Sequence, residues 1–180
     1  VEMLAPYLGP ATGPTVERAL RDDDPLVRDA AIMALAGIEP AARVVEIARR
    51  VAEVAPFEIA LADTIGVGVP AQVTDLVGRV REALPGIPLR CHFHNTRNTG
   101  LANAFGAVLA GVTTLDASLG GIGGCPFAPA ATGNIPTEDL IYMLHRSGYA
   151  TGVSLADAIA TGQWLQQQLG RPVPGMLVKA

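Results

Sequence analysis

The sequence predicts an α/β fold with parallel strands, because a strand pattern, a loop and a helix pattern recur along the chain. Short apolar runs of strand length cover residues 57–63, 88–94 and 113–119. Apolar residues at helical spacing cover 73–84 and 101–109, between those strands. Right-handed crossovers of this kind make the strands parallel. In such sheets ligands bind at the carboxyl ends of the strands, on the loops that follow.

The composition describes one globular domain of 180 residues, 49% of them hydrophobic and 17% charged. The net charge of −4 gives no basic surface, so nucleic acid is not expected as a partner. No apolar run reaches the roughly 18 residues that span a bilayer, and no secretory signal is visible. Two cysteines in unlike surroundings do not form a disulfide framework, which fits a reducing cytoplasm.

Residues 1–39 differ from the rest and are expected to form an irregular segment followed by a pair of helices similar to one HEAT-type repeat. The second helix begins at the N-cap Asp24 with Pro25 in its first turn, and it ends at Gly37. One such repeat cannot bury its own apolar face. We therefore place a boundary between this segment and an α/β part that spans 40–180.

The α/β part is expected to begin with an amphipathic helix over 40–55, before the first strand. Asp63 ends that strand and a glycine-containing loop follows it. Two further helices are expected after the third strand, with Thr137 and Ser154 as N-caps. Their ends are marked by Gly148 and Gly170.

A glycine-rich segment, GGIGGCPFAPAATGN over 120–134, follows the third strand directly. Four glycines in five residues favour neither helix nor strand, but they permit positive φ and close approach to a ligand. Cys125 stands just behind them and is followed by Pro126. Two interpretations remain open, a surface turn with a buried thiol and a loop that carries a thiol acting as acid or base.

His92 and His94 are two residues apart on the second strand, so their side chains project to the same side of the sheet. Cys91 and Phe93 then face the opposite layer, where Cys91 is expected to be inert packing. Two imidazoles on one side suit a divalent metal, although a pair of hydrogen-bonded core histidines is the alternative. Asn134 could add an oxygen ligand, and mixed nitrogen and oxygen donors favour Mg²⁺ or Mn²⁺ over structural zinc.

Four motifs in these segments, LADTIGVG, HFHNTR, GLANA and GGCPFA…TGN, together resemble 3-hydroxy-3-methylglutaryl-CoA lyase, a TIM-barrel metalloenzyme. The resemblance runs from about residue 40 to the end, and the cysteine loop is its most specific part. It implies a partial (β/α)8 barrel with about three C-terminal β/α units and extra N-terminal and C-terminal helices. It also implies a part in leucine degradation and ketone-body metabolism.

The resemblance assigns His92, His94 and Asn134 as ligands of a divalent metal, Mg²⁺ or Mn²⁺. It places Cys125, Asp63 and His92 among the catalytic residues, and Asp63, Gly123 and Gly124 in the substrate site. The reaction is metal-dependent cleavage of an acyl-CoA, 3-hydroxy-3-methylglutaryl-CoA, to acetyl-CoA and acetoacetate. In this scheme the metal acts as a Lewis acid and the thiol delivers a proton.

The chain departs from that family at one functional position, since nothing in residues 1–39 matches the Arg-Asp pair of its first strand. We therefore expect the C-terminal part of a barrel that forms a homo-oligomer or associates with the missing half, with no membrane or nucleic acid as partner. Isopropylmalate and citramalate synthases share the HxHN motif and are the alternative, although the cysteine loop favours a lyase. A non-catalytic fragment that acts as an interaction module is the third possibility.

Overall fold

The computed structural model describes residues 41–124 and 133–180. The HEAT-like pair expected before residue 40 lies outside the described residues, and so does Cys125. The domain boundary after residue 39 therefore stays a prediction.

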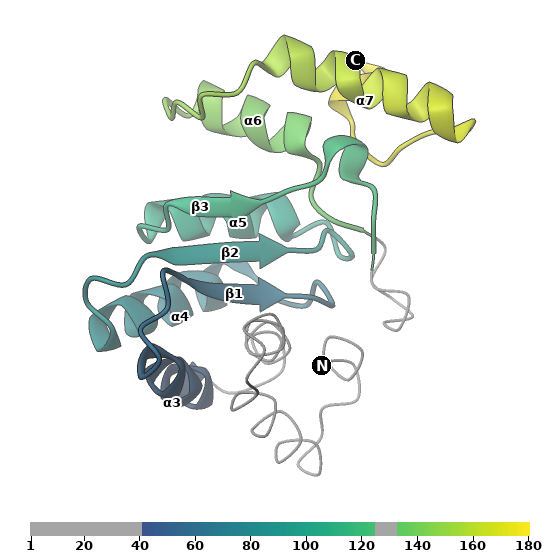
Figure 1. Cartoon of the computed structure of the whole chain (residues 1–180). Coiled ribbons are helices and arrows are strands. Elements are labelled where there is room, and N and C mark those ends of the chain that lie inside the picture. Colours follow the sequence, from purple (N-terminus) through teal and green to yellow (C-terminus); the bar gives the residue numbers. More distant parts are fainter. Residues whose placement is uncertain (1–40, 125–132) are drawn as a thin grey trace.

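Three parallel strands form one sheet in the order β1 (Ile59–Asp63), β2 (Leu89–Phe93) and β3 (Thr114–Asp116). The register pairs Asp63 with Phe93 across β1 and β2, and His92 with Asp116 across β2 and β3. Each strand is followed by a loop at the same end of the sheet (Figure 1). The predicted parallel α/β arrangement is confirmed.

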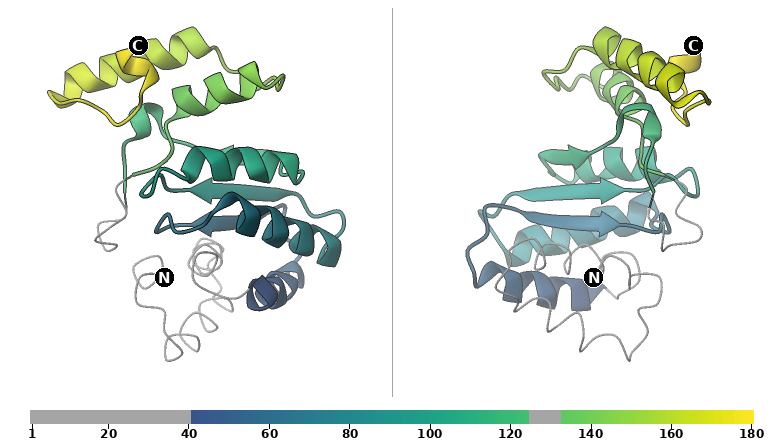
Figure 2. Two further views of the ribbon diagram at one scale, coloured as in Figure 1. Left: turned by 180° about the vertical axis from the view of Figure 1, so that it is seen from behind. Right: turned by 45° about the vertical axis from the view of Figure 1, so that its right-hand side comes forward.

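Helices α4 (Pro70–Ala83) and α5 (Gly100–Leu109) cover one face of this sheet, which Figure 2 shows from behind. Helix α3 (Ala41–Ala52) packs against α4 at the β1 side. Helices α6 (Thr137–Arg146) and α7 (Leu155–Leu169) pack on each other beyond β3 (Figure 1). Two short 3-10 turns, η2 (Leu119–Gly121) and η3 (Leu177–Lys179), lie against α6 and α7.

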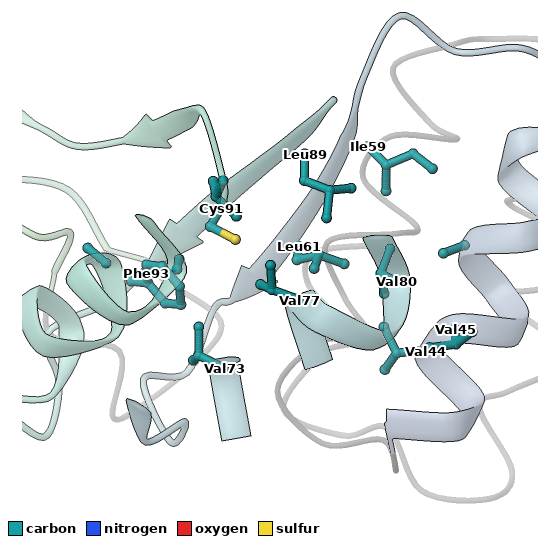
Figure 3. Close-up of a cluster of buried hydrophobic side chains, with 14 of the residues drawn as sticks. Val44, Val45, Ile59, Leu61, Val73, Val77, Val80, Leu89, Cys91 and Phe93 are labelled. Carbon is teal, nitrogen blue, oxygen red and sulfur yellow. The ribbon is translucent and has the colours of Figure 1, made fainter. Parts of the chain in front are cut away.

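The core lies between the sheet and the helices, on what we call the outer face of the sheet. Alternate strand residues point into it, and all of them are buried: Ile59, Leu61, Leu89, Cys91 and Phe93. They meet valines of α4 and α3 (Figure 3), namely Val73, Val77, Val80, Val44 and Val45. The period of two along each strand thus separates a continuous apolar layer from the opposite, inner face.

The inner face carries the other strand residues, and it is polar. Arg90 and His92 of β2 and Asp116 of β3 lie there, each partly exposed. No described helix covers this side (Figures 1 and 2). In a closed eight-stranded barrel, side chains from all strands fill the corresponding interior.

Element boundaries agree with the expected ones to within a few residues. The third strand is the largest difference, since it ends at Asp116 and the chain turns into η2 at Leu119. The N-cap of α6 is Pro136, one residue before the expected Thr137. Ser154 caps α7 as predicted, and its hydroxyl oxygen accepts a hydrogen bond from the Asp157 amide at 3.3 Å.

Among the described segments, no helix combines the length and the apolar character that crossing a membrane requires.

Candidate metal site

The two histidines predicted to share a side do so. His92 lies within β2 and His94 directly follows it, and their ring centroids are 5.1 Å apart with the planes tilted by 58°. His94 is buried, and its backbone amide donates to the Asp63 carbonyl at 3.3 Å. The carboxyl end of β1 therefore holds His94 in place.

Asn134 is brought to His94 by the backbone, although 40 residues separate them in the sequence. Ile135 donates its amide hydrogen to the Phe93 carbonyl at 3.3 Å, and Asn95 donates to the Gly133 carbonyl at 3.0 Å. These two bonds flank an isolated antiparallel bridge between His94 and Asn134. The three residues assigned as metal ligands are thus assembled at one end of the sheet.

The Asn134 amide can be oriented from its partners. Its Nδ2 donates to the Ile122 carbonyl at 3.1 Å, and a carbonyl can only accept. The Oδ1 atom is consequently the free end of the amide, and it is buried without a hydrogen-bond partner. Nδ1 of His94 is likewise buried without a partner. Buried polar atoms without partners are costly in a protein interior, so each of these two atoms needs an explanation.

A divalent ion fits these donors. Desolvation, with a smaller effect of the nearby His92, lowers the pKa of His94 to about 4. At neutral pH its imidazole is therefore neutral, which is the form that binds metals. Within 41–124 and 133–180 no three His, Cys, Asp or Glu side chains gather into a group that could hold a metal ion. An amide oxygen such as Asn134 Oδ1 is a further type of donor that hard divalent cations accept.

His92 faces a carboxylate on the neighbouring strand. Its Nδ1 lies 3.6 Å from Oδ2 of Asp116, whose other oxygen accepts a hydrogen bond from Arg90 Nη1 at 2.7 Å. The interaction with His92, followed by the hydrogen bond and charge of Arg90, holds the pKa of Asp116 below its ordinary value. Asp116 is accordingly ionised at neutral pH.

Asp63, expected in the substrate site, is buried at the end of β1 and organises its own loop. Its carboxylate accepts hydrogen bonds from the amides of Val67 at 2.9 Å and Gly68 at 2.8 Å. Asn103 of α5 donates to the Gly68 carbonyl at 2.9 Å from the other side. In this structure both carboxylate oxygens hold the loop that follows β1.

The segment before the cysteine loop needs its glycines. Gly120 and Gly121 both have φ of +69°, and a Cβ on Gly121 would lie 2.9 Å from the Pro136 ring. The fully buried Glu138 of α6 accepts a hydrogen bond from the Gly120 amide at 3.0 Å. A larger residue at Gly121 would therefore meet both backbone strain and a clash.

Gly123, a predicted substrate-site residue, lies beside the ligand set. Its backbone carbonyl accepts a hydrogen bond from the backbone N–H of Asn134 at 3.1 Å, and its φ is +89°. A Cβ there would stand 2.9 Å from Asn134 Nδ2 and would disturb the amide. Gly124 is exposed and is the last described residue before Cys125.

The structure adds three polar residues that the sequence-based reasoning missed: Asp116, Arg90 and Glu138. A signal for Arg90 was present, because it is two residues before His92 and shares its side of the strand. Cys91 is buried, as predicted, and its burial raises the pKa of its thiol to about 12. His145 lies on the exposed side of α6 and contacts Thr151 Oγ1 through Nε2 at 2.9 Å.

Comparison with known proteins places this arrangement in a family. The family model described as HMGL-like matches residues 29–165. The chain is 48% identical over 138 residues to (R)-citramalyl-CoA lyase of Chloroflexus aurantiacus. The aligned residues cover 77% of this chain and 44% of that lyase. It is 44% identical over 127 residues to hydroxymethylglutaryl-CoA lyase of Pseudomonas mevalonii, with 71% and 42% covered.

A solved HMG-CoA lyase from Acinetobacter baumannii, in complex with coenzyme A and 3-methylmalate, superimposes with a TM-score of 0.74. It is 40% identical, and the match covers 77% of this chain and 46% of that one. The chain thus spans about half the length of the relatives it matches, and its three β/α units are part of a TIM barrel. On the extent of the family match, the chain belongs to the HMGL-like family.

Proposed function

We propose that this chain supplies the ligand-bearing strand and the thiol loop of a metal-dependent carbon–carbon lyase that cleaves 3-hydroxy-3-methylglutaryl-CoA. The observation that carries the proposal is the assembly of His92, His94 and Asn134 at one end of the sheet. Two of them present buried polar atoms that have no protein partner. The lyases among the relatives support the reaction class.

His92, His94 and Asn134 would hold the divalent ion, Mg²⁺ or Mn²⁺. When bound, such an ion supplies a Lewis acid that favours the ionised form of the substrate's tertiary hydroxyl. A base in the site would remove the hydroxyl proton. The hydroxyl oxygen would become the ketone of acetoacetate, and the electrons of the broken C–C bond would pass to the α-carbon of the thioester.

Cys125 would return a proton to that α-carbon and so complete acetyl-CoA. A thiol can do this when its pKa lies near the working pH. Gly120 and Gly121 form the turn that precedes the cysteine loop, and Glu138 holds this turn by accepting a hydrogen bond from the Gly120 amide. Asp63 would act by holding the loop after β1 against the site, since its oxygens already accept two backbone amides.

(R)-Citramalyl-CoA is the second candidate substrate, and the 48% identity to a lyase of that name favours it. Both thioesters carry a tertiary alcohol on the carbon where the bond breaks. They differ by one methylene between that carbon and the free carboxylate. A methylene in a binding pocket is worth only about 1–3 kcal/mol of discrimination, so one site could process both compounds at different rates.

The metal assignment is tested by binding of Mn²⁺, which is followed by calorimetry and by paramagnetic relaxation of water. We expect weak binding by this chain and its loss in the His92→Ala/His94→Ala double variant. His145→Ala is the matched control, because it removes an exposed imidazole outside the site. Equal binding by the parent and the double variant contradicts the metal assignment.

The reaction and the substrate are tested in a complete barrel, formed by the full-length protein or by this chain with a complementing N-terminal half. Each thioester is supplied separately, and acetoacetate and pyruvate are measured as the distinguishing products. Cys125→Ser should lower turnover by ~10²–10⁴-fold while metal binding persists. A Cys125→Ser enzyme with parental turnover would make the thiol structural and favour a condensing synthase instead.

Association belongs to the same proposal. β1 and β3 are the edges of the described sheet, and unpaired strand edges promote pairing with other chains. We expect the chain alone to oligomerise and to show little lyase activity. A monodisperse monomer with full turnover, measured by light scattering and product assay, would overturn this expectation.

A further inference from the structure

Four titratable or charged side chains form a connected row across the inner face of the sheet. Glu58 precedes β1, Arg90 and His92 belong to β2, and Asp116 ends β3. Arg90 Nε donates to Glu58 Oε1 at 2.7 Å, and Arg90 Nη1 donates to Asp116 Oδ1 at 2.7 Å. The row ends at His92, whose Nδ1 is 3.6 Å from Asp116 Oδ2.

The sheet register brings these groups together. His92 and Asp116 are direct Cα partners across β2 and β3, so their side chains leave the sheet side by side. Arg90 is two residues before His92, which places it on the same face. The contact between His92 and Asp116 is therefore a consequence of strand pairing and does not depend on one exposed, freely rotating side chain.

The two oxygens of Asp116 have separate partners. Arg90 donates a hydrogen bond to Oδ1, whereas Oδ2 faces the imidazole of His92. A carboxylate can only accept, so a hydrogen bond between them requires the proton on Nδ1. At 3.6 Å the two atoms are a few tenths of an ångström beyond a normal N–H···O distance of about 2.7–3.2 Å, a gap that a small rotation of the ring closes.

We propose that Asp116 is a positioning residue that accepts the Nδ1 proton of His92 and so presents the unprotonated Nε2 as the ligand atom. Arg90 fixes the carboxylate, and Glu58 fixes Arg90. Histidine ligands commonly donate their second ring N–H to a carboxylate, which sets the tautomer and the orientation of the ring. The inference deepens the proposed function, since it rests on His92 being a metal ligand.

A purely structural role for Asp116 predicts something different. Were Asp116 only a counter-ion for Arg90, its loss would leave the His92 tautomer unchanged, because Arg90 keeps its second partner Glu58. The tautomer of His92 therefore separates the two roles. It can be read in the metal-free protein, without any activity measurement.

The experiment uses ¹⁵N-histidine NMR of the chain at alkaline pH, where imidazole side chains are neutral. The sequence has three histidines, so His94→Asn and His145→Asn variants assign the signals. The parent should carry the His92 proton on Nδ1, whereas an imidazole without a partner prefers it on Nε2. Asp116→Ala should move the proton to Nε2, and it should weaken Mn²⁺ binding by ~10–100-fold in calorimetry.

The matched control is Asp75→Ala, which removes one exposed carboxylate from an ion pair with Arg79 on α4. It changes the net charge equally and should leave both readouts at the parental values. A parent whose His92 carries its proton on Nε2 overturns the inference without the need for any variant to fold. An unchanged tautomer and Mn²⁺ affinity in Asp116→Ala also overturn it. A parent with the expected tautomer but no Mn²⁺ binding contradicts the proposed metal role instead.

Discussion

The outer face of the three strands is covered by helices of the chain, whereas no described helix covers the inner face. On the outer face, Cys91 and Phe93 are buried at 1% and 3% exposure under α4 and α5. On the inner face, the neighbouring Arg90 and His92 keep 36% and 18% of their side-chain surface exposed. Adjacent residues of β2 thus belong to a finished apolar core and to a polar surface that carries the candidate site.

The two faces contribute differently to folding stability and to ligand binding. The outer face derives its stability from apolar area removed from water, to which all four helices from α3 to α6 contribute. The inner face holds its polar groups through hydrogen bonds and ion pairs that solvent still reaches, and such pairs contribute little net stability. Substitutions on the outer face should therefore change unfolding, and those on the inner face should change ligand binding.

The largest expected effect is on the outer face. Phe93→Ala should lower the free energy of unfolding by about 3–5 kcal/mol, since it leaves a cavity under α4 and α5. Urea denaturation followed by circular dichroism measures the loss. A loss below that of Arg90→Met, the matched inner-face variant on the same strand, would break the distinction between the two faces.

Acidification should lower the free energy of unfolding, because His94 is harder to protonate in the folded protein than in the unfolded chain. Its folded-state pKa of about 4 lies below the ordinary histidine value of 6.5, so the unfolded chain binds more protons between these two pH values. Stability should thus be constant above pH 6.5 and should fall by roughly 2–3 kcal/mol on acidification toward pH 4.5. Denaturation midpoints across this range measure the slope.

His94→Asn should flatten that slope, because the group that titrates differently in the two states is gone. His145→Asn, on the exposed side of α6, should retain it. A parental slope in His94→Asn would mean that another group causes the acid sensitivity.

Cys91→Ser should have a smaller effect on the outer face, about 1–2 kcal/mol, because it buries a hydroxyl among apolar side chains. The thiol itself should resist alkylation in the folded protein, since burial raises its pKa to about 12. Mass spectrometry after iodoacetamide treatment checks this. Rapid labelling of Cys91 at neutral pH would show that the outer face opens readily.

Arg90→Met should have the smallest effect on stability, less than about 1 kcal/mol, because its ion pairs are partly exposed. It removes the group that fixes Asp116, and Mn²⁺ affinity should fall while the denaturation midpoint stays close to the parental value. A large loss of stability with unchanged affinity would reverse the assignment of chemistry to this face.

Local patterns predicted most of the fold. Alternation along residues 88–94 correctly separated Cys91 and Phe93 from His92 and His94, because the period of a strand depends on the backbone alone. Asn98, a residue type that tolerates positive φ, has φ of +58°. The glycines of the 120–124 segment were expected to allow the same conformation, and Gly120, Gly121 and Gly123 adopt it.

The partners of the site residues could not be predicted in the same way. The pairing of His92 with Asp116 depends on the β2–β3 register, and no periodicity within one strand specifies a register between two. The use of both Asp63 oxygens by backbone amides depends on how the following loop turns. Glu138 lies in the first turn of α6, where acids are usually exposed, yet it is fully buried and accepts a hydrogen bond from the Gly120 amide.

The sequence by itself determined the parallel α/β class, the common side of His92 and His94, and the glycine-rich base of the cysteine loop. Each of these follows from the conformational preferences and periodicity of residues close together in the chain. Only the tertiary structure decided that Asn134 lies beside His94, that its Oδ1 is left without a partner, and that Arg90 and Asp116 stand behind His92. Those contacts join residues that are distant in sequence, and their geometry exists only once the strands have paired and the core has packed.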